Sequence, residues 1–309
     1  MLGPLLFILY INDISNNSSF ERSLYADDAA MLLADTKLKL LKRSVNRELS
    51  HLHEWLIVNK LTLNLSKTKY MLVANINKIT YKDRKKFKLT IGKYTLHEVE
   101  KIKYLGVILD NNLNWIPHID YLVTKLSQVA GVLFNVCNHI SLKSRIMIYN
   151  GLAGSYLNYG IVAWGAASIS RLQTVQDRLV RYMTFLPPSA NTDQSFATLK
   201  ILNIKQHYFH EISKFVHSVH NNISPVIFND YFIPVTDYRS SRPSRTFLHN
   251  DYVLPKPRTE KGKHSSIFAG VKLWSKIPLN FKRLSKKNFS YQLKQYIFDH
   301  GLELDILYT

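Results

Sequence analysis

The sequence predicts an α+β fold in which a hairpin and several short strands come first and a long run of helices follows. Two apolar runs of about strand length flank Asp27-Asp28, which predicts a β-hairpin with the acidic pair at its tip. Apolar residues at helical spacing recur over 37–59 and again from residue 117 onwards. Apolar residues make up 46% of the 309 positions, enough for a folded chain with a buried core.

The first expected element is a helix that begins at Gly3-Pro4. Proline suits the first turn of a helix, and the apolar run from Leu5 to Ile11 predicts a buried one. This run is too short to span a bilayer, and it lacks the basic start of a signal peptide. Because a domain rarely begins inside its most apolar element, we expect the chain to be a piece of a longer domain. We also expect an intracellular protein of the cytoplasm and nucleus.

The acidic pair at the hairpin tip suggests a metal site. Side chains alternate along a strand, so one Asp can point into a cleft while its neighbour points aside. Adjacent carboxylates repel each other, and a divalent cation keeps both ionised at neutral pH. Mg²⁺ is usually held by one or two carboxylates plus substrate phosphates, and Mn²⁺ is the alternative ion. The chemistry indicated is two-metal transfer of a phosphoryl-type group. Asp also suits turns and water, so an ordinary solvated turn stays open on these residues alone.

The region after the hairpin predicts one long helix and then strands. The helix covers 37–59, and the alternating leucines of 61–65 predict an extended segment. Lys67 and Lys69 would share one face if that geometry continued, although Lys is also common at a wet strand edge. Gly106, inside the last strand, indicates a bend or a close backbone approach. The strands are expected at 70–74, 88–91, 94–96 and 100–109.

Helices dominate from residue 117 onwards. The change of pattern at 112–117 marks a boundary, and Pro187-Pro188 ends the first helical block. His217 and His220 could meet on a helix, but no acid or cysteine completes a ligand set, so a half-exposed surface is expected. The helices are expected at 119–136, 141–149, 152–164, 171–185 and 196–221, and the three regions at 1–112, 113–188 and 189–309.

The charge of the chain favours a polyanionic partner. The formal net charge is +19 and the pI about 9.8, which favours nucleic acid before a membrane surface. Residues 1–36 hold five acids and one base, whereas 238–293 hold thirteen bases and two acids. The Pro-, Arg- and Ser-rich stretch 234–263 is expected to be extended, and is either a phosphate-binding segment or a solvated linker. Its candidate phosphate contacts are Arg239, Arg242, Arg245, Lys261 and Lys263. The single Cys137 excludes an internal disulfide and a cysteine-based zinc site.

Four blocks in this order resemble the downstream half of a reverse transcriptase. They are Gly3-Pro4-Leu5-Leu6-Phe7 with Tyr10-Ile11-Asn12-Asp13, then Tyr25-Ala26-Asp27-Asp28, then Leu63-Asn64 with Lys67-Thr68-Lys69, then Tyr104-Leu105-Gly106-Val107. The version here is similar to the non-LTR retrotransposons, the jockey-like transposable elements. The tail is also similar to theirs, at Pro257-Arg258-Thr259, Lys272-Leu273-Trp274 and Ile277-Pro278. The resemblance is strongest from residue 1 to 109.

The resemblance implies a role for each matching position. Asp27-Asp28 match the metal-binding carboxylates of the polymerase palm, and Tyr25-Ala26 shape the turn beside the primer end. Gly3-Pro4 match the end of a segment that contacts the incoming nucleotide and template. Lys67 matches a lysine near the nucleotide phosphates, a candidate proton donor to pyrophosphate. Tyr104-Leu105-Gly106 match the primer grip. Residues 1–112 would then be part of the palm, and the helices of 113–188 the thumb.

The resemblance also implies a missing part. The family's palm carries a further metal-binding Asp on an earlier strand, and its fingers lie earlier still. Asp13, the nearest spare acid, matches a different family position. The resemblance implies an RNA-directed DNA polymerase, with RNA template, DNA primer or target and dNTP as partners. We expect this chain alone to be inactive or nearly so. The alternatives are an intron-encoded maturase, a non-catalytic nucleic-acid-binding protein, and a helical scaffold whose acidic pair is an ordinary turn.

Overall fold

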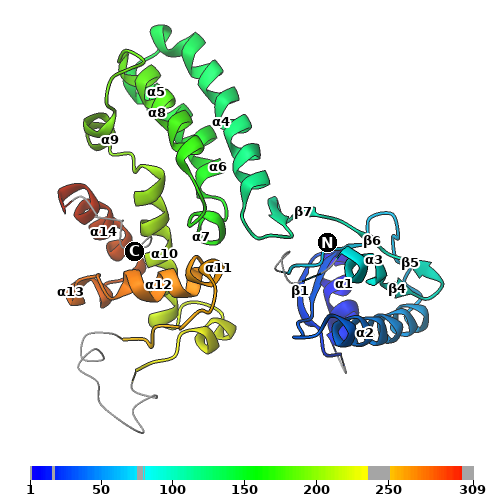
Figure 1. The fold of residues 1–309 in the computed structure, drawn as a ribbon. Helices are drawn as coiled ribbons and strands as arrows, with labels where there is room; N and C mark the ends of the chain where they lie inside the picture. The colour runs from blue at the N-terminus through cyan, green and yellow to red at the C-terminus, as the bar shows by residue number, and fades with distance from the viewer. Residues whose placement is uncertain (1, 16–17, 75–78, 80, 236–250, 301–309) are drawn as a thin grey trace. The chain divides into compact units, whose positions relative to one another are not determined.

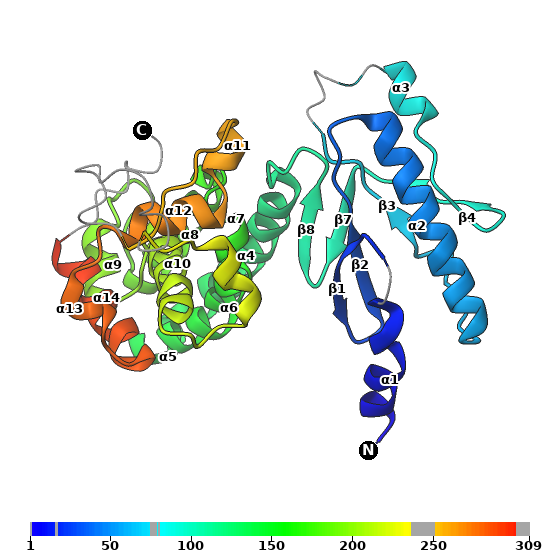
Figure 2. The same cartoon turned by 90° about the horizontal axis from the view of Figure 1, so that it is seen from below.

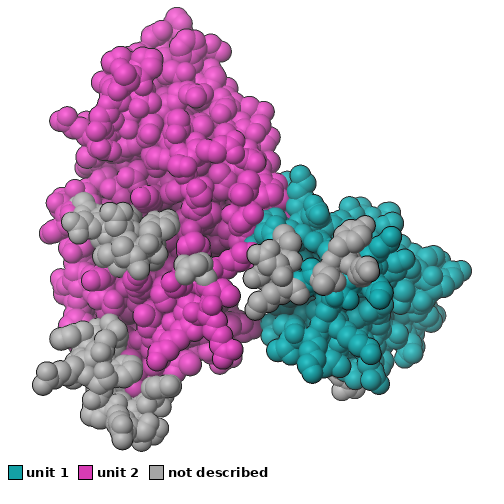
Figure 3. Space-filling view, viewed as in Figure 1, with its two compact units in different colours: residues 1–103, 110–112 teal, residues 104–109, 113–309 magenta. Residues whose placement is uncertain are grey.

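The computed structural model describes residues 2–15, 18–74, 79, 81–235 and 251–300. The fold is α+β, as the sequence predicts, with short strands in the first third of the chain and helices through the rest (Figure 1). The chain forms two compact units, drawn in two colours in Figure 3. Unit 1 comprises residues 1–103 and 110–112, and unit 2 comprises residues 104–109 and 113–309.

Unit 1 contains most of the strands, and they pair two by two. Its helices are α1 (Gly3–Ile11), a 3₁₀ helix (Asn12–Ser15), α2 (Leu38–Val58) and α3 (Tyr81–Lys86). The antiparallel pairs are β1 (Glu21–Tyr25) with β2 (Asp28–Leu32) and β4 (Thr90–Ile91) with β5 (Tyr94–Thr95), whereas β3 (Lys69–Tyr70) runs parallel to β6 (His97–Glu98). A last pair, β7 (Lys101–Tyr104) and β8 (Val107–Asp110), contains the division between the units. Among the described residues, the expected antiparallel sheet is thus a set of separate two-stranded pairs.

The core of unit 1 lies between one face of α2 and the strands. α2 contacts β4 (Figure 2), and the buried side chains are Phe20, Leu49, Leu72, Phe87, Leu89, Ile91 and Leu96. Glu48 is also buried on α2, where it accepts hydrogen bonds from the backbone N–H and hydroxyl of Ser19 at 3.0 and 3.2 Å. Burial alone would raise the pKa of Glu48, but these hydrogen bonds, together with those from Ser18 and Arg47, outweigh it and lower the pKa. This carboxylate therefore ties α2 to the chain entering β1.

Helix α1 forms as expected, but the expectation that it is buried is wrong. None of its residues is buried, and Leu5 and Leu9 are 56% and 65% exposed. Among the described residues, α1 contacts the following 3₁₀ helix, and the Tyr10 hydroxyl donates to the carbonyl of Asn59. Composition indicates that these side chains favour burial, but it does not indicate which part of unit 1 would cover them.

Unit 2 is helical and has one continuous core. α4 (Ile116–Val136) lies along α8 (Ser170–Thr184), and α10 (Ile204–His220) contacts α7, α8, α12 and α14. The other helices are α5 (Leu142–Ile148), a π-helical segment (Tyr149–Gly154), α6 (Ser155–Asn158), α7 (Ile161–Trp164), α9 (Asp193–Leu199), a 3₁₀ segment (Val226–Tyr231), α11 (Glu260–Lys263), α12 (Ser266–Trp274), α13 (Leu279–Lys282) and α14 (Lys286–His300). Fully buried members of this core include Leu126, Leu133, Leu172, Leu179 and Trp164.

Two long helices expected in this region are broken. The stretch 152–164 is interrupted at Gly160, whose φ is +65°, and 196–221 is interrupted at Lys200, whose φ is +55°. A left-handed residue ends a helix whatever apolar spacing continues beyond it. α10 then begins with a capping box, in which Asn203 and Gln206 each bond the other's backbone N–H. Among the helices that the described residues form, none is both long enough and apolar enough to cross a membrane.

Candidate functional site

The acidic pair lies at the tip of a tight β-hairpin, as the sequence predicts. Tyr25 pairs with Asp28, so Ala26 and Asp27 form a two-residue turn between β1 and β2. The φ of Ala26 is +51°, the left-handed value that the first position of a primed hairpin turn requires. Two-residue turns of this kind match the twist of antiparallel strands. The short loop therefore fixes where both carboxylates leave the backbone.

The pairing also determines which face presents Asp28. Residues opposite each other in an antiparallel pair lie on the same face, so Asp28 shares its face with Tyr25. Met31 lies on the other face and packs against the core of unit 1. Asp28 and Tyr25 therefore point away from that core, and Tyr25 is 65% exposed. Asp27, in the turn itself, is exposed as well.

The donor chemistry of this tip fits a hard divalent cation. Two exposed carboxylates on consecutive residues match the one or two protein carboxylates that commonly hold Mg²⁺, with water or phosphate oxygens completing the shell. Within the described parts of the chain, no group of three or more His, Cys, Asp and Glu side chains gathers into a ligand set. The hairpin thus offers two carboxylates that could hold a divalent cation.

Lys67 lies in a turn, and the extended geometry expected to continue from 61–65 ends before it. The backbone N–H groups of Lys67 and Thr68 both donate to the carbonyl of Asn64, at 3.1 and 2.9 Å. The Ser66 hydroxyl donates to the Asn64 side chain at 2.7 Å. Asn64 nucleates this turn because its short side chain competes for nearby backbone donors. The prediction that Lys67 and Lys69 share one strand face is therefore wrong, although both are exposed.

The structure places the remaining predicted residues on separate elements. Gly3 and Pro4 form the exposed first turn of α1. Tyr104 ends β7, and Leu105-Gly106 form a turn where the sequence predicted a bend within one strand. Lys261 and Lys263 are exposed on α11. Arg239, Arg242 and Arg245 lie outside the described residues.

Sequence reasoning missed two residues that contact the Leu105-Gly106 turn and the strand after it from within unit 2. The Tyr159 hydroxyl donates a hydrogen bond to the carbonyl of Leu105 at 2.5 Å. His118, which is buried, accepts one from the backbone N–H of Ile108 at 3.4 Å. The signal available in the sequence was Gly160, since an isolated glycine weakens the case for one continuous helix over 152–164.

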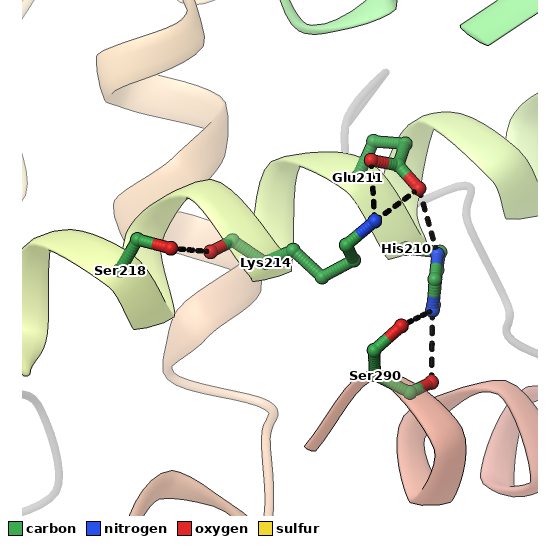
Figure 4. Close-up of polar contacts among 5 residues, drawn as sticks. All are labelled: His210, Glu211, Lys214, Ser218 and Ser290. Atoms are coloured by element: carbon green, nitrogen blue, oxygen red, sulfur yellow. Dashed lines mark hydrogen bonds and ion pairs between the residues drawn. The ribbon is translucent and has the colours of Figure 1, made fainter. Parts of the chain in front are cut away.

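The histidine-rich helix α10 carries a polar cluster that joins it to α14. His210 contacts Glu211 through Nδ1 at 3.0 Å, and its Nε2 lies 3.0 Å from the carbonyl of Ser290 (Figure 4). Lys214 donates to both Glu211 oxygens at 2.8 Å. Burial opposes ionisation of Glu211, but the His210 and Lys214 hydrogen bonds outweigh it and lower its pKa to about 2. The cluster is a structural joint between helices. Nearby, His217 is fully buried against Phe289, so the expected half-exposed surface is wrong for this residue.

Comparison with known proteins finds a family model that is similar to the hairpin region. Residues 1–109 match the family model described as reverse transcriptase (RNA-dependent DNA polymerase). The resemblance inferred from the four blocks, which include the Asp27-Asp28 tip, is therefore confirmed for this part of the chain.

The relatives come from non-LTR transposons. The chain is 26% identical over 222 residues to the RNA-directed DNA polymerase from mobile element jockey of Drosophila funebris, covering 66% of this chain and 23% of that protein. It is 25% identical over 234 residues to the probable RNA-directed DNA polymerase from transposon X-element of Drosophila melanogaster, covering 72% and 25%. A third relative is the probable RNA-directed DNA polymerase from transposon BS of the same species, at 25% identity over 203 residues, covering 60% and 22%. The chain thus spans about a quarter of the length of these relatives. No solved structure matches it.

Proposed function

We propose that this chain is part of an RNA-directed DNA polymerase of a non-LTR retrotransposon, with the β1–β2 hairpin as its metal-binding element. One observation carries the proposal. A two-residue turn presents Asp27 and Asp28 to solvent, and it lies within the residues that match the reverse transcriptase model. The relatives are named for the same activity. The substrates proposed are an RNA template, a DNA primer or target, and a dNTP.

Asp27 and Asp28 would hold Mg²⁺, or Mn²⁺ in its place. Held by these two carboxylates, the ion would supply positive charge that stabilises the reacting phosphate and the attacking and leaving oxygens. Tyr25 shares the exposed face of Asp28, where its ring would lie beside the primer end. Ala26 has the left-handed backbone of the turn, which positions Asp27 between β1 and β2. Both roles depend on the hairpin being rigid.

The other predicted residues are assigned by their match to the family. Lys67, exposed on the Asn64 turn, would donate a proton to the leaving pyrophosphate. Gly3 and Pro4 would contact the incoming nucleotide and template, and Tyr104-Leu105-Gly106 would grip the primer. Residues 1–112 would form part of the palm, 113–188 the thumb, and 189–309 a basic C-terminal region.

The C-terminal region would add affinity for the nucleic-acid backbone. Unit 2 holds 23 Lys and Arg against 11 Asp and Glu, a formal charge of +12 of the total +19. Lys261 and Lys263 are exposed, so phosphates along a strand could reach them from solvent. Arg239, Arg242 and Arg245 are assigned the same role from their sequence alone.

A second candidate function is nucleic-acid binding without catalysis. The observation that favours it is the absence, among the described residues, of a group of three metal-ligating side chains. Two carboxylates alone would hold the ions weakly and leave the in-line geometry poorly fixed. We accordingly propose that a polymerase with this site extends primers slowly as this chain alone, whereas the binding protein does not extend them at all.

The test compares primer extension on an RNA template with binding to the same template. The variants are Asp27→Asn, Asp28→Asn and, as the matched control, Glu21→Gln, an exposed carboxylate on the same hairpin face. Mg²⁺-dependent extension that either Asp variant abolishes and Glu21→Gln preserves supports the polymerase. Extension unaffected by both Asp variants contradicts their role. Tight, salt-sensitive RNA binding with no extension, and no effect of Mg²⁺, favours the binding protein.

A further inference from the structure

The turn that joins β7 to β8 has an unusual backbone. Leu105 and Gly106 have φ values of +45° and +84°, so both central residues are left-handed, as in a type I′ hairpin turn. Glycine adopts this conformation freely, whereas a leucine there brings its Cβ close to the carbonyl oxygen. Leu105 is therefore held in a conformation that it would not favour alone. Contacts from elsewhere in unit 2 must stabilise it.

Tyr159 supplies such a contact. Its hydroxyl donates to the Leu105 carbonyl at 2.5 Å. Its ring also lies directly against Gly106, since a Cβ on that glycine would be 3.0 Å from Cε1 of the tyrosine. One side chain thus fixes the direction of one turn carbonyl and fills the space beside the other turn residue. Tyr159 is 55% exposed, so it holds the turn at the surface of the unit.

The backbone of Tyr159 is itself held in place by two hydrogen bonds. Its backbone N–H donates to the carbonyl of Ser155 at 3.2 Å, and its own carbonyl accepts from the indole N–H of Trp164 at 2.9 Å. Trp164 is fully buried. The next residue, Gly160, is left-handed, and a Cβ there would lie 3.1 Å from Cγ2 of Val107 in β8. The chain around Tyr159 therefore packs against the strand that follows the turn.

His118 contacts the same strand, β8, through a hydrogen bond. Its Nδ1 accepts from the backbone N–H of Ile108 at 3.4 Å, and its ring meets Trp164 edge-on with centroids 5.6 Å apart. Burial lowers the pKa of His118 to about 4, so the ring is neutral at pH 7 and Nδ1 can act as an acceptor. Trp164 thus links the two side chains that support the turn and its strand.

We propose that Tyr159 is a positioning residue for the primer, which sets the Leu105 carbonyl and the Leu105-Gly106 turn for contact with the 3′ end of a DNA strand. This inference rests on the proposed function, which assigns Tyr104-Leu105-Gly106 to the primer grip. Tyr159 acts through the turn and does not itself contact the reacting atoms. Trp164 supports Tyr159 through its hydrogen bond to the tyrosine carbonyl, and His118 supports the strand that follows the turn.

The test uses Tyr159→Phe in the full chain, because this change removes the hydroxyl and keeps the ring. The matched control is Tyr156→Phe, one turn earlier on α6. Amide hydrogen exchange over 104–109 should become about 3- to 10-fold faster in Tyr159→Phe only, the effect of one lost hydrogen bond. The preference for a primer–template with a recessed 3′ end over a blunt duplex of equal length should fall by a similar factor. Affinity for the blunt duplex should not change.

A second variant changes the same turn without altering Tyr159, so that the result does not depend on the phenylalanine substitution alone. Gly106→Ala would place a Cβ against the tyrosine ring at a φ that alanine disfavours, so it should loosen the same turn and reduce the same preference. Unchanged exchange at 104–109 in Tyr159→Phe would overturn the positioning role. Faster exchange with an unchanged end preference would overturn the link to the primer. A wild-type chain with no preference for recessed ends would contradict the assigned primer grip itself, whereas the exchange result would still decide the structural role of Tyr159.

Discussion

Lys282 and Asp251 form an ion pair inside unit 2, with Nζ of the lysine 2.7 Å from Oδ2 of the aspartate. The same carboxylate oxygen accepts a hydrogen bond from the indole N–H of Trp274 on α12, also at 2.7 Å. The lysine side chain is 5% exposed and the aspartate side chain 30%. Burial alone would raise the pKa of Asp251, but the Lys282 hydrogen bond and charge, together with the Trp274 hydrogen bond, outweigh this and lower it. The pair therefore joins α12 and α13 to the segment that contains Asp251.

Removing the lysine should destabilise unit 2. Lys282→Met leaves the Asp251 carboxylate without its main partner, and we expect the free energy of unfolding to fall by about 2–3 kcal/mol, below the range for fully buried pairs because the aspartate is partly hydrated. Urea unfolding followed by circular dichroism measures this. Lys276→Met, an exposed lysine beyond α12, is the control and should change stability by less than about 0.5 kcal/mol. Equal effects of the two variants would show that the pair contributes little.

The left-handed residue of the acidic hairpin gives a second prediction. Ala26→Gly should stabilise the β1–β2 hairpin slightly, by about 0.5 kcal/mol, since glycine removes the clash at φ +51° but is more flexible when unfolded. Ala26→Val should destabilise it by about 1 kcal/mol or more, because a β-branched residue tolerates positive φ poorly. Amide exchange over 21–32 measures both changes. Slower exchange in Ala26→Val than in the wild type would contradict the turn geometry.

The buried histidines predict that unit 2 loses stability in mild acid. Burial lowers the pKa of His207 to about 4, and the Glu211 charge offsets only part of that effect. Between pH 6.5 and 4 the unfolded chain binds a proton at His207 that the folded chain does not. Stability present above pH 6.5 is therefore lost as the pH falls towards 4, by about 3 kcal/mol from this residue. Glu211 adds a further loss only below pH 4.5, towards its folded pKa of about 2.

Urea unfolding at a series of pH values tests this dependence. His207→Leu should flatten the stability profile between pH 6.5 and 4, because the residue that takes up the proton on unfolding is gone. His139→Leu, at an exposed histidine, should leave the slope unchanged. A His207→Leu profile as steep as that of the wild type would assign the acid sensitivity to other groups, among them His118, whose pKa is also about 4.

The spacing of apolar residues predicted the helices where that spacing continued without interruption. It failed where a single residue with left-handed backbone turned the chain. α2, α4 and α8 follow from apolar spacing, and the hairpin follows from two apolar runs around an acidic pair. The breaks at Gly160 and Lys200 and the turn at Leu105 depend on left-handed backbone, which spacing does not record. Tyr159 could not be predicted as a support for Leu105, because the two residues are 54 positions apart and meet only in the folded unit. Residue type was thus enough to select the candidate acids, whereas contacts between residues far apart in the sequence could be identified only from the structure.

The exposed lysines of α11 give the last prediction, which concerns the salt dependence of nucleic-acid binding. Each phosphate contact releases a counterion, so removing one lysine that makes such a contact should reduce the slope of log K against log salt by about 1. We expect Lys261→Gln and Lys263→Gln each to do so, with a similar loss of affinity for every sequence of single-stranded RNA. Titration of fluorescent RNA at several salt concentrations measures the slope, with Lys276→Gln as the exposed control. A loss confined to one RNA sequence would indicate base recognition, and an unchanged slope would show that α11 does not contact phosphate. Because affinity from phosphate contacts carries no sequence information, a uniform loss would mean that these lysines of α11 add affinity without recognising bases.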